Sequence, residues 1–171
     1  ALATSLKKIK ALLFSPNGLE LIATFDVGPS LIWSTVNGKP IAIGSTQLAW
    51  SLERTLGTGD GKSLITDRAN SLAFSPDGKN ILTGSEDGTA KLWDLQGKKL
   101  QSFQGHSDHV TAVAFSPDGK VLVSSGGDNI IKVWDVPGQK LTTELKGHEL
   151  GVTGVVFVGD NKTLVSISQD R

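Results

Sequence analysis

Apolar and polar residues alternate along short segments that are separated by turn residues. The clearest segment, 110–115, reads Val-Thr-Ala-Val-Ala-Phe and is rich in residues that favour strands. Ser-Pro-Asp-Gly follows at 116–119, where proline presets a negative φ and glycine accepts a positive one. The pattern predicts a strand that ends in a tight turn. No segment of the sequence shows a sustained helical period.

The same alternation continues on both sides of this segment. Three further strands are predicted in the same unit, at 121–125, 130–135 and 141–145. The preceding unit repeats the pattern, with strands predicted at 70–74, 80–83, 89–94 and 99–103. Four strands in a period of about 40 residues predict one antiparallel four-stranded sheet per unit.

A repeated phrase fixes the register of these units. Phe-Ser-Pro-Asx-Gly begins at Phe14, Phe74 and Phe115, and a tryptophan follows each phenylalanine after 19 residues. Gly-His pairs at 105–106 and 147–148 are 42 residues apart. Fixed spacing of this kind indicates a repeat architecture.

These motifs resemble the WD40 family. Gly-His, Phe-Ser-Pro-Asp-Gly, Ser-x-Asp and Trp-Asp occur in order within 105–148, and 70–104 carries all of them except the leading Gly-His. The resemblance implies an all-β fold of WD40-type β-propeller blades, each with four antiparallel strands. We expect 1–171 to be a single WD40 repeat region, with an insertion at about 45–65. The repeats are expected at about 1–44, 66–104, 105–146 and 147–171, the last of them truncated.

The outer repeats depart from the pattern. In the first repeat, Trp33 is followed by Ser34 instead of aspartate, and the tryptophan of the last repeat would fall beyond Arg171. The resemblance implies that a ring closes with about six to eight blades. Open blades would leave apolar faces and strand edges exposed, which favours association. We therefore expect either a piece of a longer propeller or copies that pair to complete a ring.

The resemblance also implies a structural network of hydrogen bonds within each blade. Indole, hydroxyl, imidazole and carboxylate groups that are half-buried can satisfy one another. Ile65 stands where the second repeat would have its histidine, so that network is expected to be incomplete. The expected members are His106, Ser124, Asp128 and Trp134 in the third repeat, Thr83, Asp87 and Trp93 in the second, and His148, Ser166 and Asp170 in the fourth.

The same residue types could be taken for a catalytic set. A general base needs an open site and a geometry that faces a substrate, and the sequence indicates neither. The structural interpretation is therefore favoured, and we expect no catalytic residues and no enzyme activity.

Candidate binding residues come from the same resemblance. In WD40 propellers, residues just before the first strand and just before the turn aspartate surround the narrow top opening. A mixture of charges there would suit a protein or peptide partner with polar anchors, although solvated turn residues would look the same. The matching positions are Arg68, Glu86, Asp108, His109 and Glu149, together with Gly127 and Gln169.

Composition narrows the classes of partner. Lys and Arg number 17, as do Asp and Glu, and this balance argues against nucleic-acid or membrane-surface binding. The sequence has no cysteine, which excludes disulfides and thiol chemistry. Two of its three histidines belong to the repeat, so we expect neither a metal nor a cofactor. No apolar run has the length of a membrane span, and we expect a cytoplasmic protein.

The favoured function is a non-catalytic scaffold for protein–protein interaction, and two alternatives remain open. Small-ligand or carbohydrate binding would use the insertion through Trp50, Glu53 and Arg54. A sensor domain of a larger signalling protein rests on family analogy. The insertion also holds a glycine-rich stretch at 57–63, which resembles a phosphate-binding loop. It is one residue too short and precedes an expected strand, so a hairpin turn is favoured.

Overall fold

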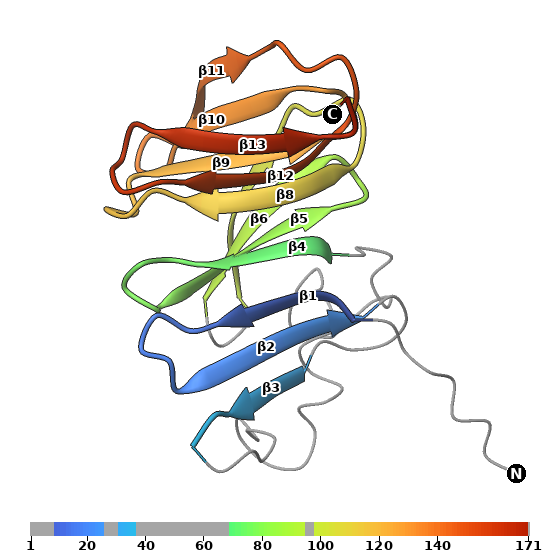
Figure 1. The fold of residues 1–171 in the computed structure, drawn as a ribbon. Helices are drawn as coiled ribbons and strands as arrows, with labels where there is room; N and C mark the ends of the chain where they lie inside the picture. Colours follow the sequence, from blue (N-terminus) through green and yellow to red (C-terminus); the bar gives the residue numbers. More distant parts are fainter. Residues whose placement is uncertain (1–8, 26–30, 37–68, 95–97, 171) are drawn as a thin grey trace, which may run out of the picture.

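A computed structural model describes residues 9–25, 31–36, 69–94 and 98–170 of the 171-residue chain. Every regular element in these ranges is a β-strand, and every strand pairing is antiparallel. The all-β, four-stranded prediction is therefore confirmed. Figure 1 shows the strands gathered into successive sheets that face one another.

We call the sheets blades 1 to 4. Blade 1 contains β1 (Ile9–Phe14), β2 (Glu20–Phe25) and β3 (Leu31–Ser34). Blade 2 contains β4 (Ala69–Phe74), β5 (Asn80–Ser85), β6 (Thr89–Asp94) and β7 (Lys99–Gln104). Blade 3 contains β8 (Val110–Phe115), β9 (Val121–Gly126), β10 (Ile131–Asp135) and β11 (Lys140–Leu145). Blade 4 contains β12 (Val152–Phe157) and β13 (Leu164–Ser168).

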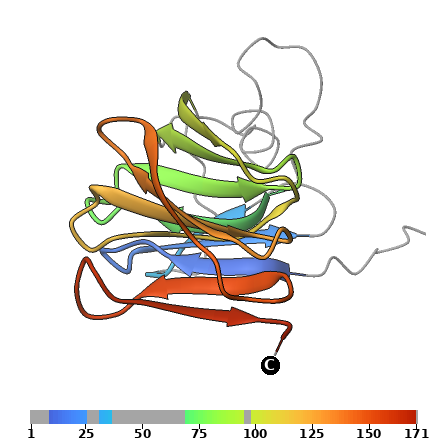
Figure 2. The same ribbon diagram turned by 90° about the horizontal axis from the view of Figure 1, so that it is seen from above.

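The first strand of each blade lies beside the first strand of the next. β1 contacts β4, β4 contacts β8 and β8 contacts β12, as Figures 1 and 2 show from two directions. Later strands of each blade lie farther from this central row, in the order β8-β9-β10-β11 in blade 3. The described sheets do not close into a ring.

Each first strand has a register irregularity at the same place. Two residues of the first strand stand there against one step of the second, which is the pattern of a β-bulge. The extra residues are Lys10, Asn70, Thr111 and Thr153. A bulge bends the strand and re-aims one side chain, and the side chains of Asn70, Thr111 and Thr153 matter for the candidate site below.

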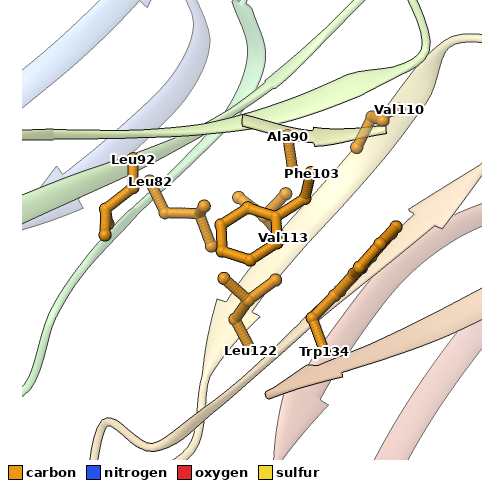
Figure 3. Close-up of a cluster of buried hydrophobic side chains, with 8 residues drawn as sticks. All are labelled: Leu82, Ala90, Leu92, Phe103, Val110, Val113, Leu122 and Trp134. Carbon is orange, nitrogen blue, oxygen red and sulfur yellow. The ribbon is translucent and has the colours of Figure 1, made fainter. Parts of the chain in front are cut away.

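The largest apolar cluster lies between blades 2 and 3 (Figure 3). Leu82 of β5 and Leu122 of β9 are fully buried in it. Phe103 and Trp134 place their ring centroids 5.5 Å apart at an angle of 59°. Burying one such side chain stabilises the fold by about 1.5–3 kcal/mol relative to leaving it exposed. Packing between blades 2 and 3 therefore stabilises the fold.

The Ser-Pro-Asp-Gly phrase forms a self-contained turn between the first and second strands. The hydroxyl of Ser116 donates to Asp118 Oδ1 over 2.7 Å, and the N–H of Lys120 donates to the same oxygen over 3.1 Å. These two bonds lower the pKa of Asp118 below its usual value. Gly119 has a φ of 70°, which explains why glycine ends the phrase.

Candidate functional site

Blade 3 brings His106, Ser124, Asp128 and Trp134 into one chain of hydrogen bonds. Nδ1 of His106 lies 2.9 Å from Asp128, and its Nε2 lies 2.8 Å from Ser124 Oγ. Trp134 Nε1 donates to the same oxygen over 2.9 Å. Since a carboxylate only accepts, Nδ1–H donates to Asp128, and in the neutral imidazole Nε2 then accepts the proton of the serine hydroxyl. Each group in the chain therefore has a partner.

The Asp-His-Ser order in blade 3 is also the order of a hydrolytic triad. Here, however, the side chains of His106 and Asp128 are only 1% and 5% exposed, and Ser124 is fully buried. The serine oxygen already accepts the indole N–H. No substrate carbonyl can approach that oxygen, so the arrangement holds strands together instead of presenting a nucleophile.

Blade 2 has the tryptophan, the hydroxyl and the turn aspartate of this network, but its sequence has Ile65 in place of the histidine. Trp93 Nε1 donates to Thr83 Oγ1 over 2.9 Å, as its counterpart does in blade 3. Asp87 instead pairs with Lys91 over 2.6 Å. The Lys91 side chain is only 10% exposed, so it supplies a cation to the turn carboxylate from within the same blade.

The lysine at the same position of blade 3 has a different partner. Lys132 is 3% exposed and forms an ion pair with Glu144 of β11. The hydrogen bond from Lys132 and, to a smaller extent, one from Lys146 lower the pKa of Glu144 below its usual value. The lysine at this repeat position therefore pairs with a turn carboxylate in blade 2 and with a strand carboxylate in blade 3.

Blade 4 brings His148, Ser166 and Asp170 together in the geometry of blade 3. Nε2 of His148 lies 2.8 Å from Ser166 Oγ, and Nδ1 lies 3.0 Å from Asp170 Oδ2. The backbone N–H of Glu149 donates to Asp170 and, together with the smaller effect of His148, lowers the pKa of that carboxyl. The side chains of His148 and Asp170 are 28% and 22% exposed, well above their counterparts in blade 3.

A pocket of about 530 Å³ opens where the first strands of blades 2 to 4 begin. We call it the mouth pocket. It gathers polar side chains from the bulges of the first strands and from the loops beside them. The lining residues are Asn70, Glu86, Asp108, His109, Thr111 and Thr153.

Three of these residues, Glu86, Asp108 and His109, were expected near a top opening, and the structure brings them into one pocket. The other three, Asn70, Thr111 and Thr153, are the bulge residues, and the sequence analysis missed them. The available signal was a polar residue at the same repeat position in three successive first strands, 41 and 42 residues apart.

The bulge residues also link neighbouring blades. Asn70 Nδ2 donates to the carbonyl of Val110 over 3.2 Å, and Thr111 Oγ1 donates to the carbonyl of Val152. Each bond joins the first strand of one blade to the first strand of the next. Two of the bulge residues thus join neighbouring blades, whereas Thr153 donates to the carbonyl of Ile167 within blade 4.

Asp108 and His109 form an exposed pair at the rim of the mouth pocket. The backbone N–H of His109 and its Nδ1 both lie 2.7 Å from Asp108 Oδ1. These bonds lower the pKa of Asp108, the backbone bond having the larger effect. The side chains of Asp108 and His109 are 54% and 46% exposed, so the ionised carboxylate faces solvent.

Those of the other expected binding residues that the structure describes do not line the mouth pocket. Glu149 is outside the mouth pocket, and its backbone carbonyl accepts a 2.9 Å bond from Asn129. Gly127 lies against Asp108, since a Cβ at 127 would be 2.6 Å from the carboxylate. Gln169 donates its backbone N–H to the carbonyl of Gly151. Arg68, Trp50, Glu53, Arg54 and the stretch 57–63 lie outside the described residues.

Two features are absent from the described ranges. No group of three or more His, Cys, Asp or Glu side chains there could hold a metal ion. No helix in the same part of the chain is long and apolar enough to cross a membrane.

Comparison with solved structures agrees with the geometry. The chain superposes on the crystal structure of RRP9 WD40 repeats with a TM-score of 0.69 and 22% identity, covering 90% of this chain and 43% of that one. It superposes on the structure of U3-55K with a TM-score of 0.70 and 22% identity, covering 90% and 44%. These likenesses show the fold, a WD40 propeller, and the chain spans less than half of either structure.

Sequence relatives carry the same repeat. WD repeat-containing protein 86 of Homo sapiens is 54% identical over 43 residues, which are 25% of this chain and 11% of that protein. WD repeat-containing protein slr1409 of Synechocystis sp. is 33% identical over 93 residues, or 54% and 23% of the two chains. The chain thus spans less than a quarter of the length of these two relatives.

The family comparison covers most of the sequence. The WD40 family, described as WD domain, G-beta repeat, matches residues 50–94, 97–135 and 139–171. The first match begins inside the stretch that we interpreted as an insertion. Since these matches span more than half of the chain, the protein belongs to the WD40 repeat family.

Proposed function

We propose that this chain is a non-catalytic scaffold for protein–protein interaction, and that its partner inserts a peptide segment into the mouth pocket. The observation that carries the proposal is the convergence of six polar side chains from three blades on one opening. Its volume of about 530 Å³ lies within the range of sites that hold ligand-sized groups. Protein binding is also typical of the family.

Charge at the pocket favours a cationic anchor on the partner. Glu86 and Asp108 each bring a carboxylate, and the lowered pKa keeps Asp108 ionised at neutral pH. The hydroxyls of Thr111 and Thr153 and the amide of Asn70 add neutral hydrogen-bonding groups. The negative charge of these carboxylates would attract a lysine or arginine side chain, while the neutral groups contact the adjoining peptide backbone.

Selection of displayed random peptides on the full chain tests this function. We expect enriched sequences to carry lysine or arginine and to bind Asp108→Asn at least fivefold more weakly, because that variant removes charge while keeping the shape. Asp160→Asn is the matched control, since Asp160 is an exposed turn carboxylate outside the pocket. Selected peptides without a cationic residue, or equal weakening by both variants, would contradict the proposal.

We also propose that copies associate to cover the open ends of the blade row. Val165 and Ile167 of blade 4 are 48% and 62% exposed, whereas Val123, the counterpart of Val165 in blade 3, is fully buried against blade 4. Leu12 and Phe14 of blade 1 are 55% and 59% exposed. These two faces correspond to the opposite sides of an ordinary blade-to-blade contact, so one copy can pack head-to-tail on another.

Light scattering with size exclusion measures this association directly. We expect a mass near twice 18.0 kDa for the chain and a shift toward 18.0 kDa for Ile167→Glu. Thr142→Glu, which adds the same charge at an exposed position of β11, should leave the mass unchanged. A monomer at every accessible concentration would refute association.

A further inference from the structure

One position of the Phe-Ser-Pro-Asx-Gly phrase differs between its copies. It is Asp77 in blade 2 and Asp118 in blade 3, but it is Asn17 in blade 1. Gly18 follows Asn17. A backbone nitrogen attacks a side-chain amide most readily in an Asn-Gly pair, because glycine has no Cβ to hinder the approach. The pair lies in the turn between β1 and β2, at the end of the blade opposite to the mouth pocket (Figure 1).

The turn holds an asparagine and an aspartate in the same way. Oδ1 of Asn17 accepts the hydroxyl of Ser15 over 2.6 Å and the N–H of Leu19 over 3.0 Å. In blade 2, Oδ1 of Asp77 accepts the corresponding hydroxyl over 2.6 Å and the corresponding N–H over 3.1 Å. Both bonds lower the pKa of Asp77, the hydroxyl having the larger effect. A carboxylate at position 17 would therefore fit the same turn with stronger hydrogen bonds.

The reactive atoms are accessible to water but are restrained by a hydrogen bond. Asn17 and Gly18 are exposed, and a Cβ at Gly18 would meet no heavy atom within 4 Å. Asp77 is exposed as well, although blade 2 has a neighbour on each side. The N–H of Gly18, whose nitrogen would be the nucleophile, donates to the carbonyl of Ser15 over 2.8 Å. Attack on the amide requires this nitrogen to lose its proton, so the turn must open first.

From these observations we propose that Asn17 is a site of spontaneous deamidation, and that the turn accepts aspartate but not isoaspartate in its place. The nitrogen of Gly18 bonds to Cγ of Asn17, the side-chain nitrogen leaves as ammonia, and a cyclic imide forms. Water then opens the ring at either carbonyl, which gives aspartate or isoaspartate. Isoaspartate adds a methylene group to the backbone between Ser15 and Gly18, which breaks their hydrogen bond. The site is separate from the mouth pocket and does not depend on the function proposed for it.

Incubation of the full chain at mildly alkaline pH in isotopically labelled water, followed by proteolysis and mass spectrometry, tests the reaction. We expect position 17 to exchange its amide for a carboxyl group and to take up the labelled oxygen. Fragment spectra distinguish it from the other Asn-Gly pair, at 37–38, which lies outside the described residues. A synthetic peptide that copies residues 13–21 should convert about tenfold faster, because it lacks the hydrogen bond that restrains the glycine.

Asn17→Gln is the matched control for this reaction, since its longer side chain would have to close a larger ring. We expect that variant to stay unconverted at position 17. Three results would overturn the proposal: no conversion of the chain over many half-lives of the peptide, equal rates in chain and peptide, or equal conversion of Asn17→Gln.

Hydrogen exchange of the Gly18 amide tests which product the turn accepts. We expect protection about fivefold higher at neutral pH in Asn17→Asp than in the unmodified chain, because charge-assisted bonds hold the turn. The isoaspartate product, separated by chromatography, should lose this protection. Asp77→Asn, the reverse change in blade 2, is the matched control and should lower protection of the Gly78 amide, which donates to Ser75 over 2.8 Å. Equal or lower protection in Asn17→Asp, or protection in the isoaspartate product, would contradict the proposal.

Discussion

Replacing Ser124 by alanine removes the oxygen that joins two buried rings. His106 Nε2 loses a donor at 2.8 Å, and Trp134 Nε1 loses an acceptor at 2.9 Å. The histidine side chain is 1% exposed and the tryptophan 4%, so water cannot readily replace the hydroxyl. Each buried polar group without a partner costs about 1–3 kcal/mol, and the expected loss of stability is therefore about 2–6 kcal/mol.

Ser166→Ala is the same change at the same position of the repeat. Here His148 is 28% exposed, so water can satisfy its Nε2 once the hydroxyl is gone. In the described structure the Ser166 hydroxyl bonds to His148, and the expected loss is that of one ordinary bond, about 0.5–1.5 kcal/mol. The two variants therefore differ in the burial of the histidine and in the hydrogen bond to Trp134, which only Ser124 accepts.

Urea denaturation followed by far-ultraviolet circular dichroism measures both losses. We expect the midpoint to fall much further for Ser124→Ala than for Ser166→Ala, with similar slopes, since a changed slope would report altered compactness instead. Losses equal within about 0.5 kcal/mol, or a larger loss for Ser166→Ala, would refute the argument that burial and the indole hydrogen bond make the blade 3 network more important for stability.

Three further predictions test the packing and the turns. Leu122→Ala should cost about 2–5 kcal/mol in urea denaturation, because it opens a cavity between blades 2 and 3; a loss below about 1 kcal/mol would contradict tight packing. Gly88→Ala should lower the melting temperature more than Gly159→Ala, since both have positive φ (78° and 69°) but only a Cβ at 88 would lie 2.9 Å from the His106 carbonyl oxygen. The lowered pKa of Asp118 means that its stabilisation is fully present above about pH 4, the range of the unfolded value, and is lost as pH falls through the folded pKa. Denaturation midpoints at pH 5 and pH 2.5 should therefore differ less for Asp118→Asn than for the unchanged chain, and equal differences would contradict this account.

Local sequence signals predict the strands well. The predicted strand at 121–125 is observed as Val121–Gly126, and the one at 141–145 as Lys140–Leu145. Alternation and turn chemistry act over a few residues, so they can be read without knowledge of tertiary contacts. The departures are one or two residues at strand ends, as at 80–83, which is observed as Asn80–Ser85, and hydrogen-bonding partners decide the boundary there.

Other features of the site depend on contacts between distant segments. Asn70 donates to the carbonyl of Val110, 40 residues away, and no local pattern predicts that bond. The replacement of histidine by Lys91 as the partner of Asp87 also needed the structure, because Lys132 at the same repeat position pairs with another carboxylate. The mouth pocket was therefore predictable only in part. Its loop residues occupy fixed positions of the repeat, whereas its bulge residues are identified by how the strands pair.

Chemical-shift mapping of a selected cationic peptide on the labelled chain tests the central claim, that a partner binds at the mouth pocket. We predict the largest amide shifts at the bulge residues Asn70, Thr111 and Thr153 and at the rim residues Asp108 and His109. Shifts confined to the Ser-Pro-Asp-Gly turns, or spread evenly over the blades, would contradict the account.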